Sequence, residues 1–338
     1  MGWLHGRAAA DAIAAGLALP LAGGPDAFTL ARLIAPGMAQ NLVPVSAIPA
    51  DWQAEIRRLT IAPPTWAGLP VGKPLIMGIL NITQDSFSDG GVHFNSVTAI
   101  DAGHAMIAAG AAILDIGGES TRPRAEPVAA EEEQRRILPV IRALASAGHC
   151  ISVDTRNAAT MAAALDAGAR IVNDVSGLTH NPAAAALVAR RACPVVLMHM
   201  RGTPADMQSH AQYDDPALEI AQELSARVAV ARAAGIAAAN IAIDPGIGFA
   251  KHTPHNLAVL RRLALFANLG QRIVLGVSRK AFIGQIGQTP DAMRRLPGSL
   301  AAGLFGLARG AHILRVHDVA ETMQALRLWH ALQSETED

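Results

Sequence analysis

The chain has 338 residues, of which 51% are hydrophobic and only 4% aromatic, and its 28 basic side chains are balanced by 28 acidic ones. This length allows one large domain or two small ones, and the aliphatic composition is typical of α/β proteins whose parallel strands are buried on both faces. The balanced charge excludes the basic surface of a nucleic-acid-binding protein.

Residues 1–70 show no regular alternation of strands and helices, and Pro63, Pro64 and Pro70 interrupt them. We interpret them as an N-terminal extension of unknown role, with two short helices, and residues 71–338 as one domain. The apolar stretch at 8–24 is interrupted by Asp11, and only Arg7 provides a fixed positive charge before it, so we do not expect a signal segment. No apolar run approaches the roughly 18 residues that a membrane-spanning helix needs. Cys150 and Cys193 each stand just before an apolar run, which indicates free, buried thiols in a reducing cytoplasm. Because no segment is suited to a membrane, we expect no membrane partner.

From Leu75 onward, short apolar runs alternate with longer Ala-rich stretches of helical period, which indicates repeated βα units and a parallel sheet. The predicted strands are Leu75–Leu80, Ala112–Asp115, Cys150–Val153, Arg170–Val172, Val195–Met198, Ile241–Ile243, Arg272–Val277 and Ala311–Val316. The predicted helices are Val97–Ala109, Ala129–Ala147, Ala158–Ala167, Pro182–Arg191, Pro216–Ala234, Thr253–Ala267, Ser299–Arg309 and Val319–Leu332. Eight such units in roughly 265 residues predict a (β/α)8 TIM barrel with an N-terminal extension. An open, doubly wound sheet is the alternative, because the pattern does not show closure.

Polar side chains follow every predicted strand, at the end where barrel enzymes carry their active sites. A single Asp after a strand is usually a turn residue, but eight polar strand ends would be costly to bury unless a ligand satisfied them. Carboxylates at Asp115, Asp154 and Asp244, with the Asn173 amide, suit a planar heterocycle rich in N–H groups. Four cations indicate an anion such as phosphate; they are Arg122, Lys280, Arg315 and His317. Dinucleotide and P-loop glycine motifs are absent, and no paired histidines follow the first strand to bind zinc.

Eight segments, in order, resemble the dihydropteroate synthases of bacterial folate synthesis: "MGILNITQDSFSDGG", "DIGGESTRP", "SVDT", "IVNDVSG", "LMHMRGTPADMQ", "DPGIGF", "GVSRKAF" and "RVHDV". The likeness extends from about Leu75 to Leu332. It implies a cytoplasmic homodimeric TIM barrel with Mg²⁺ as its cofactor. The implied reaction condenses two small molecules, 6-hydroxymethyl-7,8-dihydropterin pyrophosphate and p-aminobenzoate, into 7,8-dihydropteroate and pyrophosphate.

The resemblance also implies roles for individual residues. The pterin would be bound by Asp115, Asp154, Asn173, Asp244 and Lys280, and the pyrophosphate by Asn81, Arg122, Arg315 and His317. Asn81 would also reach Mg²⁺. Two loops, with Phe87 and Asp89 in the first and Thr121, Arg122 and Pro123 in the second, would close around p-aminobenzoate, and Phe249, Ser278 and Arg279 would complete its pocket. The catalytic residues would be Asp154, Lys280, Arg122 and Asp89.

The chain departs from the family pattern at Gln84, Arg124, Ala250 and Ala281, which bear on affinity for the second substrate and for sulfonamides rather than on the pterin set. Two alternatives follow. One is a non-catalytic relative that binds a pterin. The other is a methyltransferase that moves a methyl group from methyltetrahydrofolate to a corrinoid and needs no diphosphate site; "ESTRP" and "SRK" favour the synthase.

Overall fold

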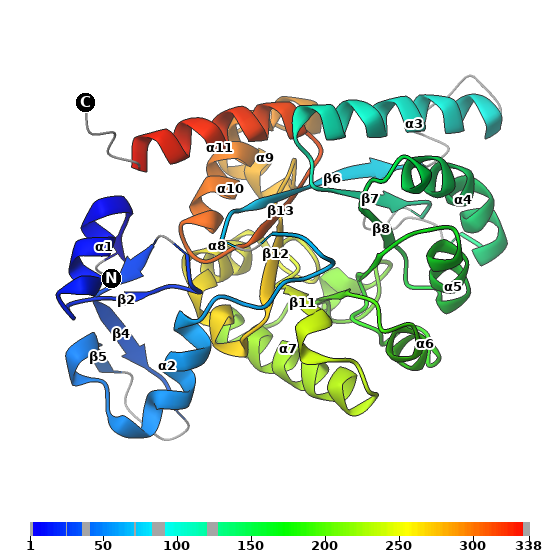
Figure 1. The fold of residues 1–338 in the computed structure, drawn as a ribbon. Helices are drawn as coiled ribbons and strands as arrows, with labels where there is room; N and C mark the ends of the chain where they lie inside the picture. The colour runs from blue at the N-terminus through cyan, green and yellow to red at the C-terminus, as the bar shows by residue number, and fades with distance from the viewer. Residues whose placement is uncertain are drawn as a thin grey trace.

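The computed structural model describes residues 3–24, 26–35, 41–70, 72–82, 92–119 and 128–333, and of residues 92–95 it describes the backbone alone. Eight parallel strands, in the order β6 to β13, form a closed barrel surrounded by helices (Figure 1). Closure is made by β13 and β6, where Ile313 pairs with Leu75 and Val316 pairs with Gly78. The fold is therefore the predicted (β/α)8 barrel, and the open-sheet alternative is excluded.

The barrel elements agree closely with the predicted ones. The strands are β6 (Leu75–Asn81), β7 (Ile113–Gly117), β8 (Ile151–Asp154), β9 (Ile171–Asp174), β10 (Val195–Met198), β11 (Ile241–Asp244), β12 (Arg272–Gly276) and β13 (Ile313–Val316). The helices are α3 (Val92–Ala109), α4 (Ala130–Ser146), α5 (Ala158–Asp166), α6 (Ala184–Arg191), α7 (Pro216–Ala233), α8 (Thr253–Arg261), α9 (Ala281–Ile286), α10 (Leu296–Leu307) and α11 (Val319–Gln333). Short 3₁₀ turns η4 (Met207–His210), η5 (Ala238–Asn240), η6 (Leu263–Leu269) and η7 (Ala292–Arg294) connect them. Gly110, Gly148 and Gly168 follow helix ends with φ between 84° and 113°, a conformation that glycine adopts without steric cost.

Two local predictions were wrong. The segment predicted as one helix over 253–267 divides into α8 and η6, because Arg262 leaves the helical region at φ −113° and ψ 24°. The short helix α9 was not predicted, since its six residues give too little helical period to recognise.

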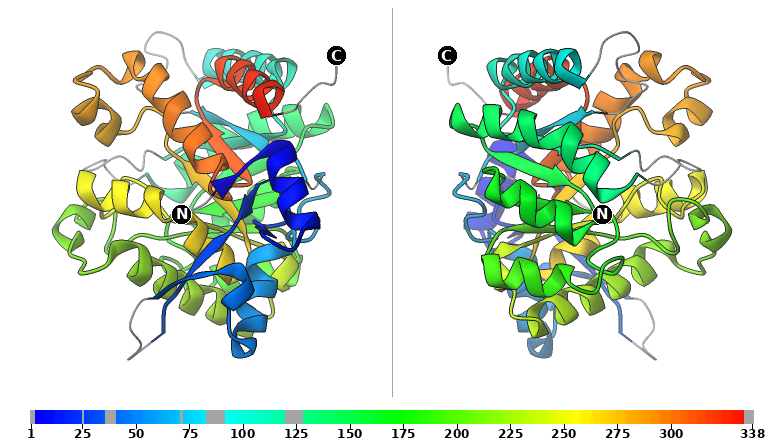
Figure 2. Two further views of the ribbon diagram at one scale, coloured as in Figure 1. Left: turned by 90° about the vertical axis from the view of Figure 1, so that its left-hand side faces the viewer. Right: turned by 90° about the vertical axis from the view of Figure 1, so that its right-hand side faces the viewer.

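The residues before the barrel form two small sheets and two short α-helices beside the barrel wall (Figure 2). Strands β1 (Trp3–Leu4), β2 (Leu19–Pro20) and β3 (Ala27–Phe28) make one sheet, and β4 (Leu30–Leu33) and β5 (Asn41–Pro44) make the other. The helices are α1 (Gly6–Ala14) and α2 (Gln53–Thr60), and the turns are η1 (Val45–Ala47) and η2 (Ala50–Trp52). Helix α2 packs against η6 of the barrel.

Trp66 closes the N-terminal end of the barrel. Its side chain is 1% exposed and belongs to a separate apolar cluster with inward-facing strand residues, including Met77, Ile113 and Val196. The indole Nε1 donates to the Asn240 carbonyl at 2.9 Å, so the ring buries its polar atom with a partner. The segment before β6 thus supplies part of the barrel core.

Strand register sets which side chains meet at the opposite, C-terminal end. Asp154 lies beside Asn173 on β9, and Gly117 of β7 lies beside Asp154. On the other side of the barrel, Arg315 pairs with Gly276 of β12. In the described part of the chain, no helix combines the length and apolar character needed to cross a bilayer.

Candidate active site

A single arginine bridges two carboxylates at the C-terminal end of the barrel. Arg315 Nε lies 2.6 Å from Asp115 Oδ2, and its Nη2 lies 2.7 Å from Asp154 Oδ2. Asn173 Nδ2 donates to the same Asp115 oxygen at 2.9 Å. Four predicted site residues from four strands are therefore in direct contact.

Each of these two carboxylates keeps one oxygen without a donor. Asp115 Oδ1 and Asp154 Oδ1 are buried, and neither accepts a hydrogen bond from any residue that the structure describes. A buried polar atom without a partner costs about 1–3 kcal/mol, and more when it is charged. Such a cost is expected where a ligand provides the missing donors. These two oxygens can therefore accept hydrogen bonds from N–H groups of a bound ligand.

Two buried acids share one arginine, and this arrangement changes the pKa of Asp154 and of Arg315. Burial raises the pKa of Asp154, the Arg315 guanidinium opposes the rise, and the Asp115 carboxylate adds to it. Burial by itself would lower the pKa of Arg315, but Asp115 and Asp154 outweigh it, so that pKa is raised and the guanidinium stays charged. The single positive charge of Arg315 is thus shared by the carboxylates of Asp115 and Asp154.

Lys280 and Asp244 form the adjacent part of the site. Lys280 Nζ donates to the Ile247 carbonyl and lies 4.3 Å from the centre of the Phe249 ring. Burial lowers the Lys280 pKa to about 8, although the Asp244 carboxylate favours the charged form. Asp244 is 6% exposed and accepts from the Gly246 backbone N–H at 2.7 Å; burial raises its pKa. The pKa of the Lys280 amine therefore lies close to neutral pH.

The remaining described residues of the predicted site lie around this centre with different contacts. His317 Nδ1 and Ser278 Oγ are 2.9 Å apart, so the ends of β12 and β13 are linked. The Arg279 guanidinium instead forms a two-point ion pair with Asp318. Asn81 is exposed at the last position of β6.

Five predicted residues, Phe87, Asp89, Thr121, Arg122 and Pro123, lie outside the described residues. Gln84 and Arg124, where the chain departs from the family pattern, do so as well.

Sequence reasoning missed a buried polar network beneath the loop after β11. Lys251 is 3% exposed, and its Nζ donates to the Phe249 carbonyl at 2.8 Å. The same nitrogen lies 3.0 Å from His199 Nδ1, and His199 Nε2 lies 2.9 Å from Glu223 Oε2. The motif containing His199 was recognised, but nothing in the sequence showed that Lys251 would be buried beside it.

Burial decides the protonation of this network. It lowers the pKa of His199 to about 4, assisted by the Lys251 charge, and it lowers the pKa of Lys251 well below its usual value. Arg201 completes the outer side through ion pairs with Glu219 and Glu223. His199 is therefore neutral at physiological pH. Its two ring nitrogens connect Lys251 to Glu223 by hydrogen bonds.

Two further side chains, Asn256 and Tyr213, hold the backbone of the loop over 245–252. Asn256 Oδ1 accepts from the Gly248 N–H at 2.7 Å, and the Tyr213 hydroxyl donates to the Ala250 carbonyl at 3.0 Å. Ala250 has φ 50°, in the left-handed region where glycine is favoured. The departure from the family glycine at this position therefore places a strained residue next to Phe249.

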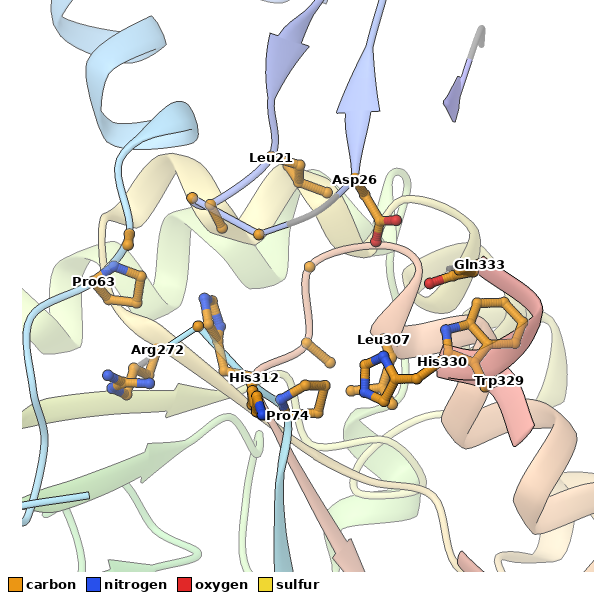
Figure 3. A pocket seen from close by; sticks show the side chains of 18 residues that line it. Leu21, Asp26, Pro63, Pro74, Arg272, Leu307, His312, Trp329, His330 and Gln333 are labelled. Carbon is orange, nitrogen blue, oxygen red and sulfur yellow. The ribbon is translucent and has the colours of Figure 1, made fainter. Parts of the chain in front are cut away.

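A separate cavity lies at the other end of the barrel, where the N-terminal segment meets the strand starts (Figure 3). Pro63, Pro74, His312 and Trp329 are among the residues around it. Pro74 precedes β6 and His312 precedes β13, so this cavity opens at the N-terminal face. Catalytic sites of TIM barrels lie at the C-terminal face, and the acids described above lie there.

Comparisons with known proteins agree with this geometry. Residues 77–317 match the family of pterin binding enzymes. The dihydropteroate synthase of Escherichia coli (strain K12) is 43% identical over 271 residues, covering 80% of this chain and 95% of that protein.

Two solved structures are similar over most of the chain. The Xanthomonas albilineans dihydropteroate synthase with 4-aminobenzoic acid has a TM-score of 0.74 and 44% identity, covering 78% of this chain and 94% of that one. The same organism's enzyme in complex with 7,8-dihydropteroate has a TM-score of 0.71 and 42% identity, covering 78% and 95%. The chain therefore belongs to the dihydropteroate synthase family of pterin-binding enzymes.

Proposed function

We propose that this chain is a transferase that condenses 6-hydroxymethyl-7,8-dihydropterin pyrophosphate with p-aminobenzoate, releasing 7,8-dihydropteroate and pyrophosphate. The observation that carries the proposal is the pair of buried carboxylate oxygens without donors, Asp115 Oδ1 and Asp154 Oδ1. A pterin ring presents ring and amino N–H groups in one plane, which satisfies both oxygens at once. The Asn173 amide and Lys280 provide the matching donors for its carbonyl oxygen and ring nitrogens.

The proposed reaction needs no protein nucleophile. The bond between the pterin methylene carbon and the pyrophosphate oxygen breaks, and its electron pair leaves with pyrophosphate. The amino nitrogen of p-aminobenzoate then forms a bond to that carbon and loses a proton to solvent. Asp154, ionised beside Arg315, stabilises the positive charge that develops on the pterin.

Pyrophosphate departure requires positive charge at the mouth of the barrel. Lys280 and His317 support an anion there, together with Arg122 outside the described residues. Arg315 contributes through Nη1, the one guanidinium nitrogen that donates to neither acid. We assign the initial recognition of the diphosphate to these cations.

The donor set fits Mg²⁺ better than zinc. No cluster of three or more His, Cys, Asp and Glu side chains suited to a metal occurs among the described residues. Mg²⁺ binds through one or two protein oxygens, substrate phosphates and retained waters, and the exposed Asn81 carbonyl at the end of β6 supplies such an oxygen. When bound, the ion would neutralise part of the diphosphate charge.

The direct test combines purified full-length protein with the pterin pyrophosphate, radiolabelled p-aminobenzoate and Mg²⁺. We expect labelled dihydropteroate, and we expect Asp154→Asn to lower turnover far more than it weakens p-aminobenzoate binding. Asp101→Asn, an exposed change on α3, is the matched control and should retain full activity. Pterin binding by the unaltered protein without any product would identify a non-catalytic binder and refute the enzyme assignment.

We also propose a homodimer in the cytoplasm. On α11, Val319, Thr322 and Leu326 are buried against the barrel, whereas Leu328 and Leu332 are 62% and 77% exposed. The exposed pair is not used in barrel packing and supports a contact with a second copy. Cys150 and Cys193 are both free and buried, which supports a reducing compartment. Sedimentation of the Leu328→Glu, Leu332→Glu double variant tests the dimer: a monomer is expected, and an unchanged dimer would refute this contact.

A further inference from the structure

Another cavity lies between the N-terminal segment and the barrel wall, away from the acids described above. Its volume is about 270 Å³, and β4, α2 and η6 contribute to its walls. Apolar side chains dominate the lining, among them Phe28, Leu33, Trp52, Ile56, Leu59 and Leu265. Because η6 leads into the start of β12, the cavity belongs to the N-terminal half of the barrel and is independent of the proposed catalytic centre.

The rim of this cavity carries an excess of positive charge. Arg32, Arg261 and Arg262 line it, together with a single acid, Glu55. Glu55 is already neutralised by Arg58 of the same helix, with Oε1 2.6 Å from Nη2. Among the described residues, Arg32 and Arg261 form no ion pair, so their charges remain available to a ligand.

Arg262 supplies an independent sign that a partner is missing. Its Nη1 donates to both carboxylate oxygens of Asp215, at 2.6 and 2.7 Å. Its Nη2 is buried and has no hydrogen-bond partner within the described part of the chain. A buried guanidinium N–H without an acceptor is costly, and because Arg262 lines the cavity, a carboxylate bound there is a candidate acceptor.

We propose that this cavity binds a small amphipathic carboxylate, with its apolar body against Phe28, Leu59 and Leu265 and its charged end at the arginine rim. Apolar lining with a few convergent polar groups is the usual form of a small-molecule site. Burial of the apolar body supplies most of the affinity, at roughly 25 cal/mol per Å² of apolar surface removed from water, and the arginines select an anion. The site accordingly discriminates by charge among ligands of similar shape.

The test uses the full chain and two fluorescent probes of similar shape, the anionic 1-anilinonaphthalene-8-sulfonate and the neutral N-phenyl-1-naphthylamine, with dodecanoate and dodecanol as competitors. We expect one saturable site from which dodecanoate displaces the anionic probe more effectively than dodecanol does. In the Arg32→Met, Arg261→Met double variant, dodecanoate affinity should fall about tenfold or more, a change of about 1.4 kcal/mol, while neutral-probe affinity changes by less than about twofold. Both arginines are exposed, so the variant is expected to fold.

Two controls make the result decisive. The Arg142→Met, Arg294→Met double variant removes two exposed arginines far from the cavity, and it should bind dodecanoate normally. Ala264→Trp fills the cavity and should abolish binding of both probes, with folding checked by circular dichroism. Equal losses in the two arginine double variants, or unchanged binding in Ala264→Trp, would overturn the proposal. Conversion of a dimer to a monomer by Ala264→Trp would overturn the proposal too, because it would show that a second copy of the chain covers this cavity in the unaltered protein.

Discussion

Arg315 and Asp154 form an ion pair across the mouth of the barrel, with Nη2 2.7 Å from Oδ2 and only 9% of the aspartate side chain exposed. Because the same guanidinium also holds Asp115, the three groups together carry a net negative charge when both acids are ionised. A site of this kind favours a ligand that acquires positive charge, as the pterin does when pyrophosphate leaves.

Replacing this arginine should affect both stability and catalysis. In Arg315→Met the two acids lose their shared counter-charge, and removal of one partner from a buried ion pair typically costs about 3–5 kcal/mol. We expect the free energy of unfolding, measured in urea, to fall by that amount and product formation to fall below detection. The exposed Arg142→Met is the matched control. Wild-type activity in Arg315→Met would show that the bridge is not required.

The rate of reaction should depend on pH with a maximum between about 7 and 8. Burial raises the Asp154 pKa to about 7, so the carboxylate predominates only above that pH. Burial lowers the Lys280 pKa to about 8, so its positive charge is lost as the pH rises further. The profile of kcat/KM for the pterin pyrophosphate should therefore rise to about pH 7 and decline above about pH 8.

Lys280→Arg separates the two limbs of this profile. An arginine stays charged throughout the accessible range, so the alkaline decline should disappear even though the overall rate falls. A decline that persists at the same pH in the variant would assign it to another group.

Lys251 acts as a positioning residue in this interpretation. Lys251→Met removes the donor to the Phe249 carbonyl and leaves His199 Nδ1 without its neighbour. Because Phe249 belongs to the proposed p-aminobenzoate pocket, we expect KM for p-aminobenzoate to rise about three- to tenfold, with KM for the pterin nearly unchanged. The exposed Lys73→Met is the control. An equal rise in both KM values would indicate general loosening of the fold instead.

The barrel was predictable because each strand and helix leaves a local pattern in the sequence. Apolar runs of three to six residues and glycines after helices require no knowledge of distant contacts. The polar side chains at the strand ends were also visible, because in a parallel barrel all strand ends meet on one face. That face brought Asp115, Asp154 and Asn173 together as expected.

Individual contacts were less accessible to sequence reasoning. Arg315 was assigned to an anion, yet in the structure it joins two acids. The closed barrel places β13 next to β6, and so brings the end of β13 near the ends of β7 and β8, a neighbourhood that local sequence patterns do not show. Arg279 follows the same strand as Lys280, but its left-handed backbone, with φ 58°, accompanies an ion pair with Asp318. Trp66, which closes the N-terminal end of the barrel, lies in a segment whose prolines indicated only irregular structure.

Trp66 provides a test of how far the N-terminal segment stabilises the barrel. Trp66→Ala would open a cavity among Met77, Ile113 and Val196 and remove the hydrogen bond to Asn240, so we expect a loss of about 3–5 kcal/mol in the free energy of unfolding. Trp66→Phe retains most of the ring volume and should lose less. The active site lies at the opposite end of the barrel, so KM for both substrates should remain within about twofold of the unaltered protein at temperatures where each variant is folded. Unfolding in urea, followed by circular dichroism, gives the first quantity and steady-state kinetics the second. If Trp66→Ala were as stable as the unaltered chain, the segment would be an appendage, and the barrel core would be complete without it.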